Sequence, residues 1–315
     1  MDAAMNEALG VEESEKGEKS LFTVERAAWM GVVLLAAGLR LYQLGLRPAG
    51  EGEASQAMAA YRFTQGAAQS APAGTIPALF TGNVAGFTLL GSDDLVMRWL
   101  PALAGLILVL LPYWLRHRLG RGGAFAASLM LAISPSVVYF SRTLDGAIVV
   151  AACGLALAVG LIHYLDARRA GALYFAAASL GLGLTAGPGT FTLLLIFAAF
   201  ALLLYVLERL AEFEAGWSSL LVAWTALRGE KGLGARTGAV LAGTFGLAAT
   251  AFVLHPAGLG HAADLLGTWA VSFLPEPGGQ HIIYPSLLLL RYEGLIVLFG
   301  LAEIAWVAYG GWRIH

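Results

Sequence analysis

The sequence predicts an all-α polytopic membrane protein with about eight transmembrane helices. Of its 315 residues, 58% are hydrophobic and 13% are charged, and the mean hydropathy is +0.72. Soluble domains contain about 25% charged residues, so lipid rather than water surrounds much of this chain. Apolar runs of about 20 residues, the length that crosses a bilayer, recur along it. Its 40 glycines suit helices that pack closely in lipid.

Eight runs have the length and composition of membrane-spanning helices. The first follows a strongly acidic stretch, residues 1–20, which we expect to be a disordered cytoplasmic tail. The remainder, residues 21–315, is expected to form one transmembrane module. The predicted spans are residues 23–44, 98–115, 123–140, 146–165, 170–186, 190–210, 237–255 and 285–306.

The distribution of basic residues predicts which connections are cytoplasmic. Lysines and arginines concentrate in cytoplasmic loops. In this chain, most of the lysines and arginines that lie outside the predicted spans are found before the first span or in every second connection between spans. The opposite connections hold Arg47, Arg62, Arg98 and Arg142. We therefore expect both termini to be cytoplasmic in a cell (plasma) membrane. Loops 45–97 and 256–284 would then lie outside, and an amphipathic segment, 211–236, on the inner surface.

Composition excludes several functional classes. The net charge of −2 and the lack of a basic patch argue against nucleic-acid binding. Cys153 is the single cysteine and lies in an apolar run, so the sequence predicts neither a disulfide framework nor a thiolate metal cluster. The histidines expected outside, His255, His261 and His281, lack the spacing of a metal site. We therefore expect no metal and no resident cofactor.

The external loop 45–97 is where chemistry is expected, because it is polar and rich in carboxylates. Residues 53–65 have the pattern of an interfacial amphipathic helix, and the broken apolar run 76–90 is also expected at the membrane interface. Glu51 and Glu53, at the mouth of the first span, suit a general base. The alternative is structural, since Glu53 would also favour the positive N-terminal end of the helix that it begins.

Charged residues near two later spans are further candidates. Asp145 opens the fourth span, where an aspartate also suits an N-cap. Arg142, three residues earlier, suits a phosphate held by charge-assisted hydrogen bonds. Arg291 and Glu293 lie roughly 9–12 Å into the last predicted span. Ionisable groups at such depth commonly mark a functional site.

Several short stretches are similar to the motifs of one family. They are LRLYQLG followed by RP and an acidic pair, GSDDLVMRWLPALAGL (residues 91–106), SPSVVYFSR (134–142) and GGQHIIYPSLLLLRYE (278–293). In order and topology they resemble the polyprenyl-phosphate-sugar glycosyltransferases of the GT-C fold, which include the protein mannosyltransferase and aminoarabinose transferase relatives. The resemblance covers roughly residues 24–306 and implies a GT-C-like fold with external interfacial helices.

The chain departs from the family pattern at three places. One is a family subgroup's Arg-Asn-Asp after the SPSVVYFSR stretch, which is replaced by residues 143–147, so that Asp145 is displaced. The family's Asp-Glu pair after the first span aligns with Gly52 and Glu53. The aspartate taken as the base is therefore missing, and Glu51 is the nearest substitute. A Lys-Glu pair common after the fifth span is replaced by Ala186, Gly187 and Pro188.

The resemblance implies a membrane glycosyltransferase whose donor substrate is a lipid-phosphate-linked sugar at the outer membrane face. The expected base is a carboxylate, either Glu53 or Glu51, assisted by Asp145. The expected cations for the leaving phosphate are Arg142 together with Arg62 or Arg98. Arg291 and Glu293 complete the candidate substrate-binding set.

A second hypothesis comes from a different class of protein. The missing aspartate and Lys-Glu pair favour a catalytically degenerate GT-C module that serves as a structural or lipid-binding subunit of a larger membrane complex. Both hypotheses stay open at the level of sequence. The expected partners are membrane lipids, a polyprenyl-phosphate sugar and, in the second case, other membrane subunits.

Overall fold

The computed structural model describes residues 24–67, 74–210, 220–222, 225, 232–274, 284–294, 297–302 and 305, and every regular element in these residues is helical. The expected all-α class is therefore confirmed. The predicted tail 1–20 and most of the predicted amphipathic segment 211–236 lie outside the described residues. The helices are α2 (Val24–Leu41), α3 (Glu51–Thr64), α4 (Pro77–Leu90), α5 (Asp94–Met97), α6 (Trp99–Leu110), η1 (Leu111–Leu115), α7 (Arg116–Ile133), α8 (Pro135–Ser141), α9 (Ala147–Ala167), α10 (Ala170–Ala186), α11 (Gly189–Leu210), α13 (Leu233–Ala249), α14 (Gly258–Val271) and α15 (Tyr284–Tyr292).

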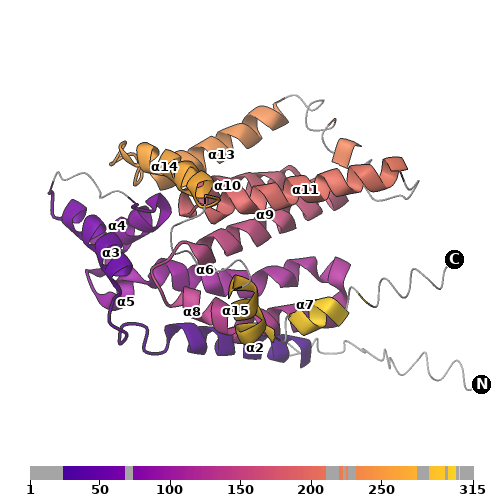
Figure 1. Ribbon diagram of the computed structural model, residues 1–315, viewed down its shortest axis with the longest axis horizontal. Helices are drawn as coiled ribbons and strands as arrows, with labels where there is room; N and C mark the ends of the chain where they lie inside the picture. Colours follow the sequence, from indigo (N-terminus) through magenta and orange to yellow (C-terminus); the bar gives the residue numbers. More distant parts are fainter. Residues whose placement is uncertain are drawn as a thin grey trace, which may run out of the picture.

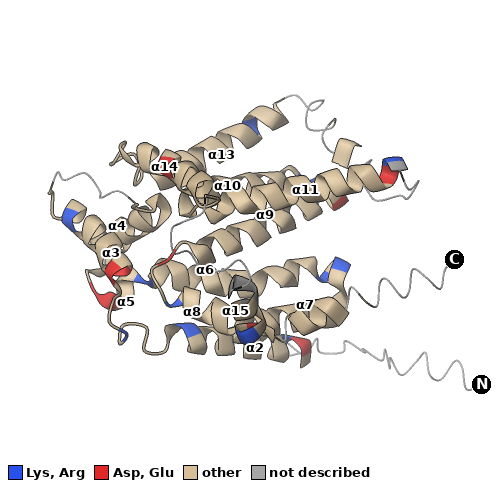
Figure 2. Cartoon of the chain, viewed as in Figure 1, with Lys and Arg blue, Asp and Glu red and all other residues tan. Residues whose placement is uncertain are grey.

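Three helical stretches of the described chain are long and apolar enough to cross a membrane. They are Trp99–Ile133, Ala147–Ala167 and Gly189–Arg209, and α4 and α10 are shorter apolar helices. Charged residues lie toward the ends of the long helices (Figure 2). These features support a membrane protein, while the number of eight spans stays a prediction.

The stretch Trp99–Ile133 contains two antiparallel segments. Trp29 near the start of α2 packs edge-on against Tyr113 of η1, whereas Glu25 lies 3.6 Å from Arg121 of α7. At the other end of α2, Arg40 donates hydrogen bonds to the α7 carbonyls of Leu131 and Ala132. The chain therefore reverses near the start of α7, and the rest of α7 runs parallel to α2.

Two residues explain where this reversal and the end of α7 fall. Gly120 has φ 72°, a left-handed conformation that glycine adopts without steric cost. Pro135 follows Ser134, whose extended backbone (ψ 123°) ends α7, because the residue before a proline disfavours the helical region. The span predicted over 123–140 is therefore wrong at its C-terminal end, where a separate helix, α8, begins.

Helices α9, α10 and α13 form the tightly packed half of the bundle (Figure 1). Small residues make this packing close. A side chain at Gly181 of α10 would collide with Thr244 and the Leu241 carbonyl of α13. By contrast, most side chains along α11 are exposed, as expected of a helix that faces lipid.

The short helices α3, α4, α5 and α8 lie at one end of the bundle (Figure 1). The predicted helix 53–65 is confirmed as α3, and Met58 and Tyr61 point away from the protein interior as exposed side chains. Their contact with the bilayer stays a prediction. Helix α4 has a largely buried N-terminal half, and the region 256–284, predicted as a loop, contains α14.

Candidate functional site

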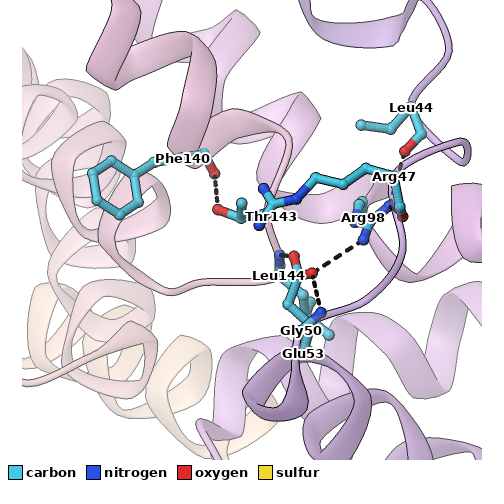
Figure 3. Close-up of polar contacts among 8 residues, drawn as sticks. All are labelled: Leu44, Arg47, Gly50, Glu53, Arg98, Phe140, Thr143 and Leu144. Carbon is cyan, nitrogen blue, oxygen red and sulfur yellow. Dashed lines mark hydrogen bonds and ion pairs between the residues drawn. The ribbon is translucent and has the colours of Figure 1, made fainter.

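A buried ion pair between Glu53 and Arg98 lies at the centre of the candidate site. Glu53 is in the first turn of α3 and 8% exposed, whereas Arg98, between α5 and α6, is 0% exposed. The Arg98 Nη2 atom lies 3.1 Å from Glu53 Oε2. Glu53 Oε2 also accepts a hydrogen bond from the Gly50 amide at 3.0 Å, and Oε1 accepts one from the Leu144 amide at 2.7 Å (Figure 3).

The remaining donor capacity of Arg98 holds the connection between α2 and α3. Its Nη1 donates to the carbonyl oxygens of Leu44 at 3.0 Å and Arg47 at 2.9 Å. Three segments distant in sequence therefore meet at this pair: the α2–α3 connection, the start of α6, and the turn before α9. We call Glu53, Arg98 and these bonded backbone groups the Glu53 cluster.

The Glu53 carboxylate is held in its ionised form. Burial alone would raise its pKa, but hydrogen bonds from Arg98, Gly50 and Leu144, together with the charge of Arg98, outweigh this effect and hold the pKa below its usual range. A carboxylate with a lowered pKa and both oxygens engaged accepts a further proton poorly. Glu53 therefore acts chiefly to position the surrounding chain.

Two other candidate carboxylates are exposed beside the cluster. Glu51 lies at the first position of α3, two residues before Glu53, so its side chain points to a different side of the helix. Asp145 directly follows Leu144, whose amide binds Glu53, and Asp145 Oδ1 accepts a hydrogen bond from the Ala147 amide at 2.7 Å. The start of α3 and the Asp145 turn are therefore neighbours, although about 90 residues separate them.

Arg142 binds the C-terminal end of α2. Its Nη1 donates to the carbonyl oxygens of Leu39 at 2.9 Å and Tyr42 at 2.8 Å, and its Nη2 donates to that of Gln43 at 3.3 Å. Leu39 belongs to the last turn of α2, and Tyr42 and Gln43 directly follow that helix, so Arg142 lies where the helix dipole favours a cation. Arg142 therefore has a structural role, because its guanidinium is bonded to backbone carbonyls and does not point into a cavity.

The other candidates lie away from the Glu53 cluster. Arg62 is exposed near the C-terminal end of α3, nine residues or about 14 Å along the helix from Glu53. Glu293 of α15's C-terminal extension is 8% exposed and accepts hydrogen bonds from Ser134 Oγ at 2.6 Å and the Ser136 amide at 2.9 Å, at the start of α8. Arg291 is exposed on α15.

Two arginines near the cluster were not singled out in the sequence. Arg40 is fully buried and donates to the Ala36, Leu131 and Ala132 carbonyls. Arg47 lies with its guanidinium 5.2 Å from the centre of the Tyr139 ring. An arginine inside an apolar span was the available signal for Arg40, because such a residue requires polar partners. Among the described residues, no group of three His, Cys, Asp or Glu could hold a metal ion.

One family comparison bears on this geometry. Residues 83–227 match the family model described as dolichyl-phosphate-mannose-protein mannosyltransferase. That stretch is similar to this mannosyltransferase family. The predicted resemblance to GT-C glycosyltransferases is confirmed over these residues, which form a little under half of the chain and supply Arg98 and Leu144 but not Glu53. The match supports a membrane glycosyltransferase of the GT-C type. No curated protein and no solved structure matched the chain.

Proposed function

We propose that this protein is a membrane glycosyltransferase that takes a sugar from a lipid-phosphate donor at the outer membrane face. The observation that carries the proposal is the Glu53 cluster, which brings the acidic start of α3 beside Asp145 at one end of an apolar helical bundle. The mannosyltransferase family match over residues 83–227 supports the reaction class.

The proposed reaction is an inverting displacement at the anomeric carbon. The acceptor hydroxyl oxygen forms a bond to that carbon, the bond from the carbon to the phosphate oxygen breaks, and polyprenyl phosphate leaves. A carboxylate takes the hydroxyl proton, and arginine side chains stabilise the charge on the departing phosphate. The donor is a substrate, and no resident cofactor is required for these steps.

Glu51 is the better base of the two glutamates. Both are candidates from the sequence, but the oxygens of Glu53 already bind Arg98, Gly50 and Leu144. Glu51 is exposed and makes no ion pair with another described residue. Asp145, held beside the cluster through Leu144, is the second carboxylate able to bind the acceptor or share its proton.

Exposed arginines suit the phosphate of the donor better than arginines whose guanidinium groups already bind backbone carbonyls. Arg98 and Arg142 donate to backbone carbonyls, so they chiefly hold the loops in place. Arg47 and Arg62 are exposed. We assign Arg47 the phosphate role because its own carbonyl is part of the Glu53 cluster, with Arg62 as a more distant contact for the donor. Glu293 then fastens the end of α15 to the start of α8 rather than touching the sugar, and Arg291 is exposed on α15.

The proposed topology follows from the basic residues. Both termini would be cytoplasmic in the plasma membrane, so the end of the bundle that carries α3, α5 and α8 would face outward. The arginines at the opposite end, including Arg116, Arg118 and Arg121 of α7, would then lie at the cytoplasmic surface.

The degenerate-subunit hypothesis is a second candidate because Gly52 stands where the family carries its aspartate. A reconstitution assay separates the two. The purified protein is placed in liposomes with a polyprenyl-phosphate hexose and a mixture of hydroxyl-bearing acceptors (peptides and glycans), and release of polyprenyl phosphate is measured. For the transferase, Glu51→Gln should lower turnover by about 10²–10⁴-fold, the usual contribution of a general base.

The matched control for this assay is Arg121→Gln, an exposed change at the opposite end of the bundle, which should leave turnover unchanged. Glu53→Gln should also lower turnover, but together with loosening of α3. Folded wild-type protein that releases no polyprenyl phosphate from any hexose donor would contradict the transferase. A loss caused by Glu53→Gln with none from Glu51→Gln would exclude Glu51 as the base.

A further inference from the structure

A long apolar groove runs between α6 and α10 along the surface of α9. Both α6 and α10 pack against α9, and two hollows lie along that seam. One has a volume of about 540 Å³ and extends toward α4, and the other, of about 490 Å³, extends toward the start of α10. Ile107 and Phe175 line both hollows, so the two adjoin at these side chains.

The floor of the groove is one face of α9. Val149, Cys153, Ala156, Gly160 and His163 line it at spacings of three or four residues, which place side chains on the same helix face. Most of these side chains are small, so the groove is deep where α9 passes beneath it. The distance along α9 from the first to the last of these residues is about 21 Å at 1.5 Å per residue. This is more than half of the roughly 30 Å thickness of the hydrocarbon core of a bilayer.

The basic side chains that line the groove lie at the end remote from the Glu53 cluster. His163 lines it there, and its Nε2 atom is buried without a hydrogen-bond partner among the described residues. Arg169 lines the same end and makes no ion pair with another described residue. Gly171 and Ala172, in the first turn of α10, complete it. Amide groups in the first turn of a helix favour an anion.

A buried nitrogen without a partner is costly, so a ligand at this end should supply a hydrogen-bonding oxygen to His163. A cation and a helix N-terminus at the same place require that ligand to be negatively charged. The apolar length of the groove requires a hydrocarbon chain attached to it. A phosphate with an attached acyl chain satisfies all three requirements.

We propose that this groove binds one anionic glycerophospholipid from the leaflet that faces away from the candidate site. Its phosphate lies against Arg169, His163 and the first turn of α10, and one acyl chain lies along α9 between α6 and α10. The phosphate end of the groove is separate from the proposed sugar transfer, because α9 begins just after Leu144 of the Glu53 cluster and Arg169 follows the other end of that helix (Figure 1). The inference therefore does not depend on the proposed activity.

The neighbouring Arg168 provides a matched control for Arg169. Arg168 is also exposed, but its guanidinium lies 5.6 Å from the centre of the Tyr164 ring and does not line the groove. Detergent-purified wild-type protein, Arg169→Gln and Arg168→Gln are incubated with phosphatidylglycerol, and bound lipid is counted by native mass spectrometry. We expect one tightly held lipid on the wild type and on Arg168→Gln, and affinity lower by about tenfold for Arg169→Gln, the usual effect of losing a hydrogen bond to a charged group.

A second pair of variants tests the chain-binding part. Ala178 lines the groove from α10 and is half-buried, so Ala178→Leu should fill it and lower the affinity. Ala199→Leu, on the exposed surface of α11, should not. Equal affinity for phosphatidylglycerol and phosphatidylcholine, displacement of the lipid by inorganic phosphate alone, or tighter binding of polyprenyl phosphate than of phosphatidylglycerol would each overturn the proposal. So would equal losses for Arg168→Gln and Arg169→Gln.

Discussion

Replacing Arg98 should release α3 from the bundle without unfolding the membrane helices. In Arg98→Met, the apolar part of the side chain is kept, but Glu53 remains as a buried carboxylate that has lost its cation. The Leu44 and Arg47 carbonyls lose their donors at the same time. Breaking a buried ion pair by removing one partner costs about 3–5 kcal/mol.

This cost applies to the local opening of α3, because the Glu53 cluster is its main polar attachment. A loss of about 3 kcal/mol corresponds to roughly a hundredfold change in an equilibrium constant. Amide hydrogen exchange reports such local opening. We therefore expect the amides of residues 54–64 to exchange about two orders of magnitude faster in Arg98→Met, while those in the middle of α9 keep their wild-type rates.

Two further variants make the interpretation specific. Arg62→Gln removes an exposed arginine from the same helix and should change exchange by less than about threefold, in line with the small contribution of surface charges. The double variant Glu53→Gln with Arg98→Met should recover part of the loss, because it no longer buries an unpaired charge. Wild-type exchange rates across α3 in Arg98→Met would refute the role assigned to the cluster.

Three other predictions follow from the same contacts. The folded-state pKa of Glu53 is lowered, so its stabilisation of α3 is present above the usual glutamate pKa of about 4.3 and is lost as the pH falls through the lower folded-state value. Exchange of α3 amides measured from pH 7 downward should show this loss. In Glu53→Gln this pH dependence should be absent. Arg142→Ala should accelerate amide hydrogen exchange at the C-terminal end of α2. Arg142→Lys should recover part of the protection, since lysine keeps the positive charge but lacks the planar guanidinium. Equal effects of the two changes would exclude the charge as the cause. In a Cys153→Ala background, cysteines at Ser70 and Ser219 should react with an impermeant reagent from outside and from inside respectively, and labelling of the second in intact cells would reverse the proposed topology.

The helical class and α3 could be predicted because they depend on local pattern. Apolar runs of membrane length recur along the chain, and the polar stretch from residue 51 has helical spacing with carboxylates in its first turn. The end of α7 was missed for a local reason as well. Pro135 was present in the sequence, but the apolar residues on both sides of it concealed the break.

Some residues of the Glu53 cluster could be predicted from the sequence, but the contacts among them could not. Glu53, Arg98 and Asp145 were all selected from sequence, and the structure brings Glu53 to Arg98 and to the residue before Asp145. Which carboxylate would be engaged depended on contacts made across 45 and 91 residues, and no local pattern encodes such contacts. The cation beside Glu53 was equally hidden, since Arg98 lies 45 residues from it along the chain.

The span of the Glu53 cluster along the chain also constrains how the protein is made. Glu53 and Leu144 are 91 residues apart, and ribosomes add roughly 5–20 residues per second. Several seconds or more therefore pass between synthesis of α3 and arrival of the turn that completes its attachment. Throughout that interval α3 can pack against α4 but lacks its bond to the Leu144 amide, so the Glu53 cluster is completed only after the turn before α9 has been synthesised.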